Sequence, residues 1–187
     1  VRSILKKVAE QYRLKDSIMA IRQSLAHFES VETTQRKRSV KEIVLPILNA
    51  MGIAGEAGSD DVLTMMGLLI HRTNNVEQLP SLKELYEAVA RQTKEEETEI
   101  LKESKAIEQR IRRLILTAIN NLAALGVIDY TNPEFEYYAP RYFDFQEIRS
   151  RMKQMEENAE LPIRVKVNSK KFLQVLYLET MENYNKA

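Results

Sequence analysis

Residues 104–126 carry side chains that are well suited to bind a polyanion. At about 100° per residue along a helix, the apolar side chains of this stretch fall on one arc. The candidate DNA-binding residues fall on the other arc, which we call the basic face: Lys105, Gln109, Arg110, Arg112, Arg113, Leu116, Thr117 and Asn120. Arginine suits guanine edges and phosphates, and glutamine and asparagine suit adenine. The pattern predicts a helix that packs by its apolar arc and reads a major groove with its basic face.

An ordinary solvated helix surface is the alternative interpretation of the basic face. Such surfaces usually pair glutamate with lysine three or four positions apart. Here the polar arc has almost no acid, and Glu108 lies at its edge. This imbalance favours nucleic-acid binding.

Catalytic chemistry finds little support in the sequence. There is no cysteine, so thiolate chemistry is excluded, and a zinc site would need histidines and carboxylates. His27 and His71 each stand alone, without a neighbour that would make an acid–base pair. The glycine-rich stretch 52–58 lies beside Glu56, Asp60 and Asp61, which would repel phosphate. These three carboxylates also form only a weak candidate metal site. We expect a protein that is not an enzyme and uses no cofactor or metal.

The composition favours an all-α protein that positions the basic face. The 187 residues are 44% hydrophobic and 7% aromatic, with five glycines and five prolines, whereas a sheet protein would show more turns and β-branched runs. No apolar run approaches the roughly 18 residues of a membrane span, and no signal peptide is visible. A cytoplasmic protein without a membrane partner is therefore expected.

The net charge of +1 conceals a segregation of charge along the chain. Residues 1–41 carry ten positive and four negative charges, and residues 42–103 carry five positive and twelve negative ones. Residues 104–126 carry four positive charges and one negative, and residues 131–187 carry nine of each. Two basic zones thus flank an acidic body, which is informative about partners.

Residues 1–38 are predicted to form a long linker helix with a coiled-coil seam. The seam residues alternate in spacing of four and three: Leu14, Ile18, Ile21, Leu25 and Phe28. Polar Gln11 falls at a core position and could set the register of a dimer. A helix that packs on its own domain is the other interpretation of the same pattern. The basic run 33–42 that follows fits a hinge, a phosphate-binding arm or a solvated linker.

Two further segments complete the expected organisation. Residues 39–130 are predicted to form a helix-turn-helix DNA-binding domain, and residues 131–187 a helical extension packed on it. Within this part, the aromatic-rich stretch 127–145 is expected to be irregular and fixed to the core by ring burial. Helices at about 144–158 and 169–184 are expected to end the chain.

Three stretches in succession, at 48–74, 79–93 and 106–119, resemble the DNA-binding effector domain of the sporulation master response regulator. Over roughly 45–180 the chain is closer still to the YcbB-type domain of two-component response regulators, some of them linked to glutamine utilisation. The matching motifs are patterns of apolar and basic residues, and include NLAALG and the aromatic stretch through YFDF.

In the aligned recognition helix, the Val, Glu, Ile and Arg of the family pattern correspond to Ile107, Glu108, Ile111 and Arg112. Two positions depart from it, because Ala106 and Gln109 stand where the family has arginine. The chain therefore shares the residue pattern of the family's recognition helix. Its two departures do not let the family's DNA target sequence be carried over to this chain.

The resemblance also implies partners. The opening VRSILKK is similar to the closing helix of an upstream phospho-receiver domain, which implies such a domain in the full-length chain and a homodimer controlled by phosphorylation. Double-stranded DNA is the expected target, and RNA polymerase is a further candidate partner. An RNA-binding antitermination effector and a protein-binding adaptor are the two alternatives.

Overall fold

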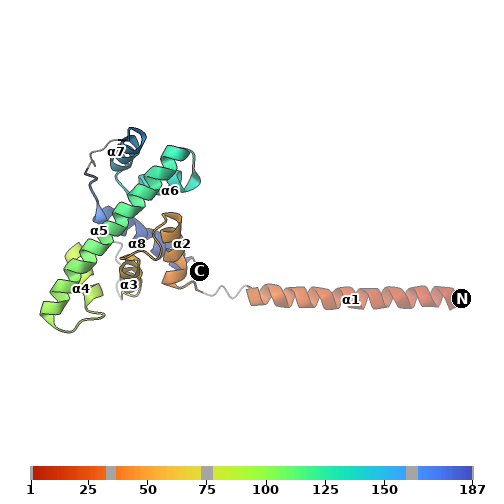
Figure 1. Cartoon of the computed structure of the whole chain (residues 1–187). Coiled ribbons are helices and arrows are strands. Elements are labelled where there is room, and N and C mark those ends of the chain that lie inside the picture. The colour runs from red at the N-terminus through yellow and green to blue at the C-terminus, as the bar shows by residue number, and fades with distance from the viewer. Residues whose placement is uncertain (1, 33–36, 73–77, 159–163, 187) are drawn as a thin grey trace. The chain divides into compact units, whose positions relative to one another are not determined.

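The computed structural model describes residues 2–32, 37–72, 78–158 and 164–186, and within them it confirms the all-α prediction (Figure 1). The described residues form eight helices and no strand. They divide into two units, one ending at Lys37 and the other comprising Arg38–Lys186. Each unit is described by itself.

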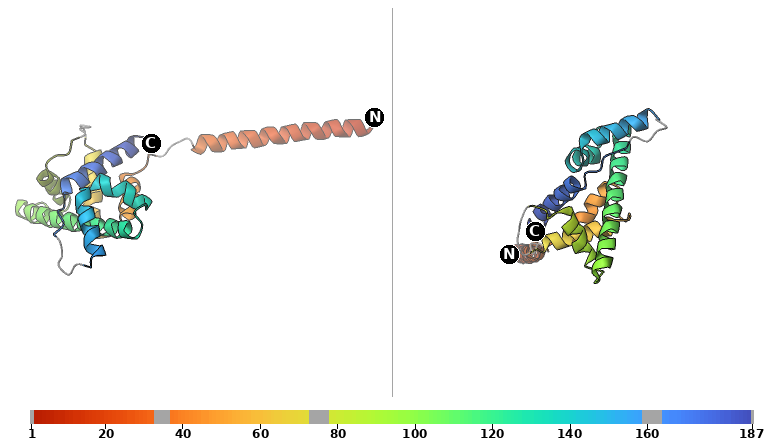
Figure 2. Two further views of the ribbon diagram at one scale, coloured as in Figure 1. Left: turned by 90° about the horizontal axis from the view of Figure 1, so that it is seen from above. Right: turned by 90° about the vertical axis from the view of Figure 1, so that its left-hand side faces the viewer.

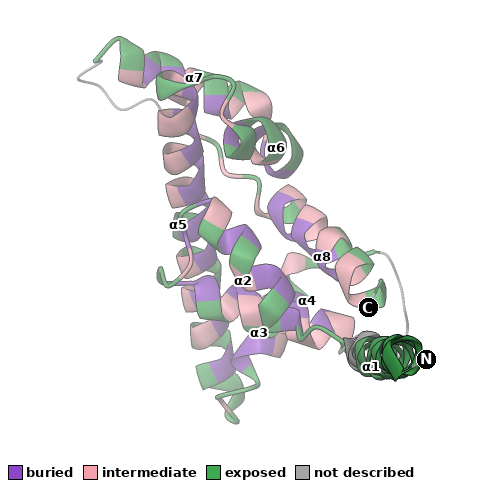
Figure 3. Cartoon of the chain, turned by 90° about the vertical axis from the view of Figure 1, so that its right-hand side faces the viewer, coloured by how far each residue is buried: buried purple, intermediate pink, exposed green. Residues whose placement is uncertain are grey.

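The first unit is one helix, α1 (Arg2–Glu32). All side chains described in it, those of residues 2–26, are exposed (Figure 3). The seam residues Leu14, Ile18, Ile21 and Leu25 expose between 47% and 66% of their surface. The side chain of Phe28, the fifth seam residue, lies outside the described residues.

The second unit is built around α5 (Glu97–Ile128). Its other helices are α2 (Val40–Ala50), α3 (Ser59–Ile70), α4 (Leu82–Ala90), α6 (Pro133–Tyr142), α7 (Phe145–Glu156) and α8 (Ser169–Asn185). Helices α3, α4, α6, α7 and α8 all contact α5. Figure 2 shows α5 along one side of the unit, with α6 and α7 near its C-terminal end.

Helix α5 is longer than predicted, because it begins at Glu97 and takes the acidic run before residue 104 into its first turns. The predicted apolar arc is confirmed as the core-facing side, with these residues buried: Ile107, Ile111, Leu114, Ile115, Ala118, Ile119 and Leu122. By length and composition alone α5 could cross a membrane. Its apolar side chains instead form the centre of the core that the surrounding helices cover.

The aromatic-rich stretch corrects the prediction of an irregular segment, because residues 133–142 form helix α6. Asn132 caps this helix by accepting a hydrogen bond from the Phe135 backbone N–H (3.2 Å), and Pro133 occupies its first turn, where the missing N–H costs nothing. The expected ring burial is confirmed for Phe135, Tyr142 and Phe143, whereas Tyr130 and Tyr137 are exposed. The local start signal at 132–133 therefore outweighed the turn propensity of its residues.

We predict that Gly126→Ala destabilises the second unit by about 1 to 3 kcal/mol. A Cβ atom at Gly126 would lie 2.5 Å from Cε2 of Phe135, whose buried ring is held between the rings of Tyr130 and Phe145. Gly67→Ala in α3 is the matched control, since a Cβ atom there meets nothing within 4 Å. The control should raise the free energy of unfolding by up to about 1 kcal/mol. Urea unfolding measures the free energy of unfolding of both variants. Equal changes in the two variants would contradict the close packing of Gly126 against Phe135.

Candidate nucleic-acid interface

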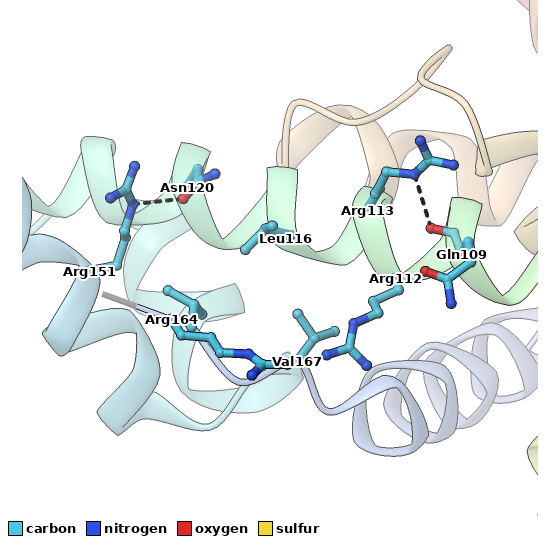
Figure 4. A pocket seen from close by; sticks show the side chains of 9 residues that line it. Gln109, Arg112, Arg113, Leu116, Asn120, Arg151, Arg164 and Val167 are labelled. Atoms are coloured by element: carbon cyan, nitrogen blue, oxygen red, sulfur yellow. Dashed lines mark hydrogen bonds between the residues drawn. The ribbon is translucent and has the colours of Figure 1, made fainter. Parts of the chain in front are cut away.

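Part of the basic face opens onto a groove of about 410 Å³ beside α5 (Figure 4). One side consists of residues on α5: Gln109, Arg112, Arg113, Leu116 and Asn120. The other side consists of α7 and the segment that precedes α8: Arg151, Arg164, Val165 and Val167. We call this surface, lined by these nine residues, the basic groove.

The charge of the basic groove has one sign. Four of its nine lining residues are arginines and none is acidic. In the view of Figure 4, Arg112 and Arg164 extend toward the same part of the groove, on either side of Val167. Leu116, Val165 and Val167 supply an apolar lining between the guanidinium groups. Guanidinium groups that gather on an open surface without carboxylates favour a bound polyanion.

Hydrogen bonds fix several side chains of the groove. Arg151 Nε donates to Oδ1 of Asn120 (2.8 Å), which ties α7 to α5. Arg113 Nε donates to the backbone oxygen of Gln109 (3.3 Å), so this side chain lies along its own helix. Arg112 is exposed, and among the described residues no hydrogen bond or ion pair holds its guanidinium group. The groove thus combines a positioned arginine on α7 with one on α5 that can adapt to a ligand.

Arg110 has a different environment from the other arginines of the basic face. Its Nε donates to Asp61 Oδ2 (2.8 Å), and its Nη2 donates to Asp61 Oδ1 (3.1 Å) and to Glu103 Oε1 (2.6 Å). These hydrogen bonds, with that to Asp61 the strongest cause, raise the pKa of Arg110 above its ordinary value. Arg110 therefore joins α3 to α5.

The remaining residues of the basic face lie outside the groove lining. Lys105 is exposed and lines a separate groove between α4 and α5. Thr117 is half-buried, and its hydroxyl donates to the backbone oxygen of Arg113 (3.0 Å). The neighbouring Asn121 donates to the backbone oxygens of Met51 and Gly52, each at 3.1 Å, and so fixes the end of α2 to α5.

Sequence reasoning missed the side of the groove that α5 does not form. Arg151 and Arg164 lie 31 and 44 positions after Asn120 in the chain, and no local pattern links them to the basic face. The positive charge of these two residues was the only sign of a binding role in the sequence, and many other surface residues carry the same charge. Only the packing of α7 and the segment 164–167 beside α5 brings them to the groove.

Comparisons with known proteins give two matches. The model of the YcbB domain family matches residues 43–176, a range that contains the whole basic groove. The transcriptional regulatory protein GlnL of Bacillus subtilis (strain 168) is 35% identical over 192 residues, which cover 95% of this chain and 60% of that relative. The chain thus spans about 60% of the length of this relative. No solved structure matches the chain.

We predict that Asp61→Asn lowers the free energy of unfolding by about 1 kcal/mol, because it removes the carboxylate that binds Arg110 through two hydrogen bonds. Asp60→Asn is the matched control, since Asp60 is exposed in the same first turn of α3 and has no recorded side-chain partner among the described residues. Both changes remove one negative charge from the same helix start, so their difference isolates the ion pair. Thermal unfolding measures it, and equal melting temperatures would argue against the ion pair.

Proposed function

The chain belongs to the YcbB domain family, and from this membership and its basic groove we propose that it regulates transcription by binding double-stranded DNA. The observation that carries the proposal is a groove with four arginines and no acidic residue, in a chain of net charge +1. The name of the relative GlnL, a transcriptional regulatory protein, supports the same role. The sequence of α5 supports it further, because arginine, glutamine and asparagine on one face are base-reading side chains.

The proposal assigns different contacts to the two ends of the groove. Gln109, Arg112 and Arg113 are exposed, whereas Leu116 and Asn120 are half-buried beside Arg151. A helix reads bases only where it can enter the major groove. We therefore assign base contacts to Gln109, Arg112 and Arg113. Arg151 and Arg164, on the flanking segments, are assigned to the phosphates on either side.

The reading segment lies in the middle of α5. Gln109 is twelve residues after Glu97, or roughly 18 Å along the helix axis. The intervening turns carry Glu97, Glu99 and Glu103, which repel phosphate. In this proposal α4 and α5 form the helix-turn-helix, but the acidic start of α5 stays outside the DNA and Arg110 positions the reading segment without contacting a base.

The active species is proposed to be a homodimer joined through α1. Its seam residues are exposed at the spacing of a coiled coil. The resemblance to response regulators supports an upstream receiver domain in the full-length protein, whose phosphorylation would promote dimerisation. Two DNA-binding units would then bind paired half-sites, and contact with RNA polymerase would convert this binding into an effect on transcription.

We predict that Arg112→Ala with Arg113→Ala weakens binding to a selected duplex site on the order of 100-fold, because two base contacts made by charged side chains are lost. The magnitude of the slope of log K against log salt should fall by up to about two. The duplex is first selected from a random library with the full chain. Gel shifts at a series of salt concentrations then give both quantities.

The matched control is Arg149→Ala with Lys153→Ala, which removes two positive charges from α7 outside the basic groove. It should change duplex affinity less than threefold. Hairpin RNA in the same series separates the alternatives, because preferential RNA binding would support an antitermination effector. Failure to bind either nucleic acid would support a protein-binding adaptor. An unchanged affinity of the Arg112/Arg113 variant would falsify the assignment of the groove.

We predict that Arg151→Gln and Arg164→Gln each reduce the magnitude of the salt slope by about one, because each removes one phosphate contact. Neither should alter the base preference in a repeated library selection. Gln109→Ala is the comparison variant. It should relax the base preference and leave the salt slope unchanged, because glutamine carries no charge. A new base preference for Arg151→Gln would show that the division of contacts is wrong.

A further inference from the structure

We infer that α1 pairs with a second copy of itself in a parallel, in-register coiled coil. This inference rests on the proposed dimer and adds the orientation of its two chains. The structure supplies the surface, because the apolar side chains of the seam are exposed on a continuous 31-residue helix. Their spacing assigns Leu14 and Ile21 to the d positions of a heptad, and Ile18 and Leu25 to the a positions.

The polar residue of the seam favours the parallel orientation. Gln11 occupies an a position, one turn before Leu14. In a parallel, in-register pair, a positions face a positions, so the two Gln11 amides can hydrogen-bond to each other. An antiparallel pair that keeps Ile18 opposite Ile21 would set Gln11 opposite Phe28. An amide that is buried without a partner destabilises that arrangement.

The charges that flank the seam favour the same orientation. Glu10 lies at a g position and Lys15 at the following e position. A parallel pair brings Glu10 beside Lys15 of the second copy, twice by symmetry. The antiparallel pair would bring Lys15 beside Arg22 of the second copy, also twice, and would leave Glu10 without a basic partner. Charge complementarity therefore selects the parallel pair over the antiparallel one.

The seam is short, which makes the pairing dependent on protein concentration. It offers four apolar layers among the described side chains, and Lys7 at the preceding d position ends it. A stable coiled coil usually needs three or four heptads. The parallel orientation places both C-terminal ends of α1 together, whereas the antiparallel pair would separate them by roughly 37 Å. In a weak parallel pair, the two DNA-binding units therefore both follow the same end of the coiled coil.

Cysteine cross-linking of the full chain tests the orientation, because the chain has no cysteine of its own. We expect Leu14→Cys to form an interchain disulfide under mild oxidation, since the two copies of a d position are adjacent in a parallel pair. In an antiparallel pair this position would face Leu25. A mixture of Leu14→Cys and a longer, tagged Leu25→Cys would then yield the mixed disulfide. Gln23→Cys, on the outer side of the helix, is the control for random collision.

Sedimentation equilibrium of the cysteine-free chain supplies a second readout. Lys15→Glu should weaken the dimer roughly tenfold, because it sets Glu10 against a glutamate, and adding Glu10→Lys should restore it. In an antiparallel pair Lys15→Glu would instead strengthen the dimer. Cross-linking of Leu14→Cys above the Gln23→Cys control, together with the charge rescue, supports the inference.

The opposite results overturn it: no cross-link above the control, a dominant mixed disulfide, or a tighter Lys15→Glu dimer. Neither measurement involves DNA. A chain that cross-links as expected but binds no duplex would therefore overturn the proposed function alone, and a chain that binds duplex without the Leu14→Cys cross-link would overturn this inference alone.

Discussion

The second unit depends on one constraint, which is that α5 must fill the core and present the basic groove at the same time. A helical repeat of about 3.6 residues satisfies both demands, because side chains three and four positions apart share one face. Ile107, Ile111 and Leu114 enter the core, while Gln109, Arg112 and Arg113 remain exposed between them. Any rotation of α5 about its axis would bury guanidinium groups and expose isoleucine, so the core packing also orients the groove.

Specific polar contacts at the border between the two faces strengthen this orientation. Arg110 binds Asp61 on α3, and Asn121 binds the backbone at the end of α2. Both side chains reach another helix, and the guanidinium group of Arg110 therefore does not add to the exposed positive surface. This guanidinium group is also not available to a ligand. Its contact with α3 instead fixes the rotation of α5 about its axis, and with it the positions of Arg112 and Arg113, the two arginines of α5 that line the basic groove.

The sequence predicted those parts of the structure that local periodicity determines. The buried arc of α5 follows from its 3.6-residue repeat, and α2 begins after Ser39, which forms a capping box with Glu42, a local signal that the sequence carries. Helix α6 was missed because tyrosines and two prolines suggest irregular structure, although Asn132 and Pro133 form a regular helix start. Four of the nine residues that line the basic groove could not be predicted from the sequence, for a different reason. Arg151 and Arg164 come to the groove through tertiary packing, and the same is true of the contact between Arg110 and Asp61, which lie 49 positions apart.

The two units carry separate surfaces for the two proposed kinds of binding, which are pairing between copies and binding of DNA. Among the described residues, the second unit buries its apolar side chains in a core shared by all its helices, whereas α1 exposes a regular seam along its length. Association between copies therefore requires little change in the unit that carries the groove. A seam of few layers would bind weakly, so a modest additional free energy, such as the proposed receiver domain would supply, would shift the proposed monomer–dimer equilibrium strongly. In the proposed dimer, two grooves would bind one DNA molecule with the gain in apparent affinity that linkage of two binding sites provides. In the proposed regulator, weak pairing through α1 would make DNA binding more responsive to a signal than strong pairing would.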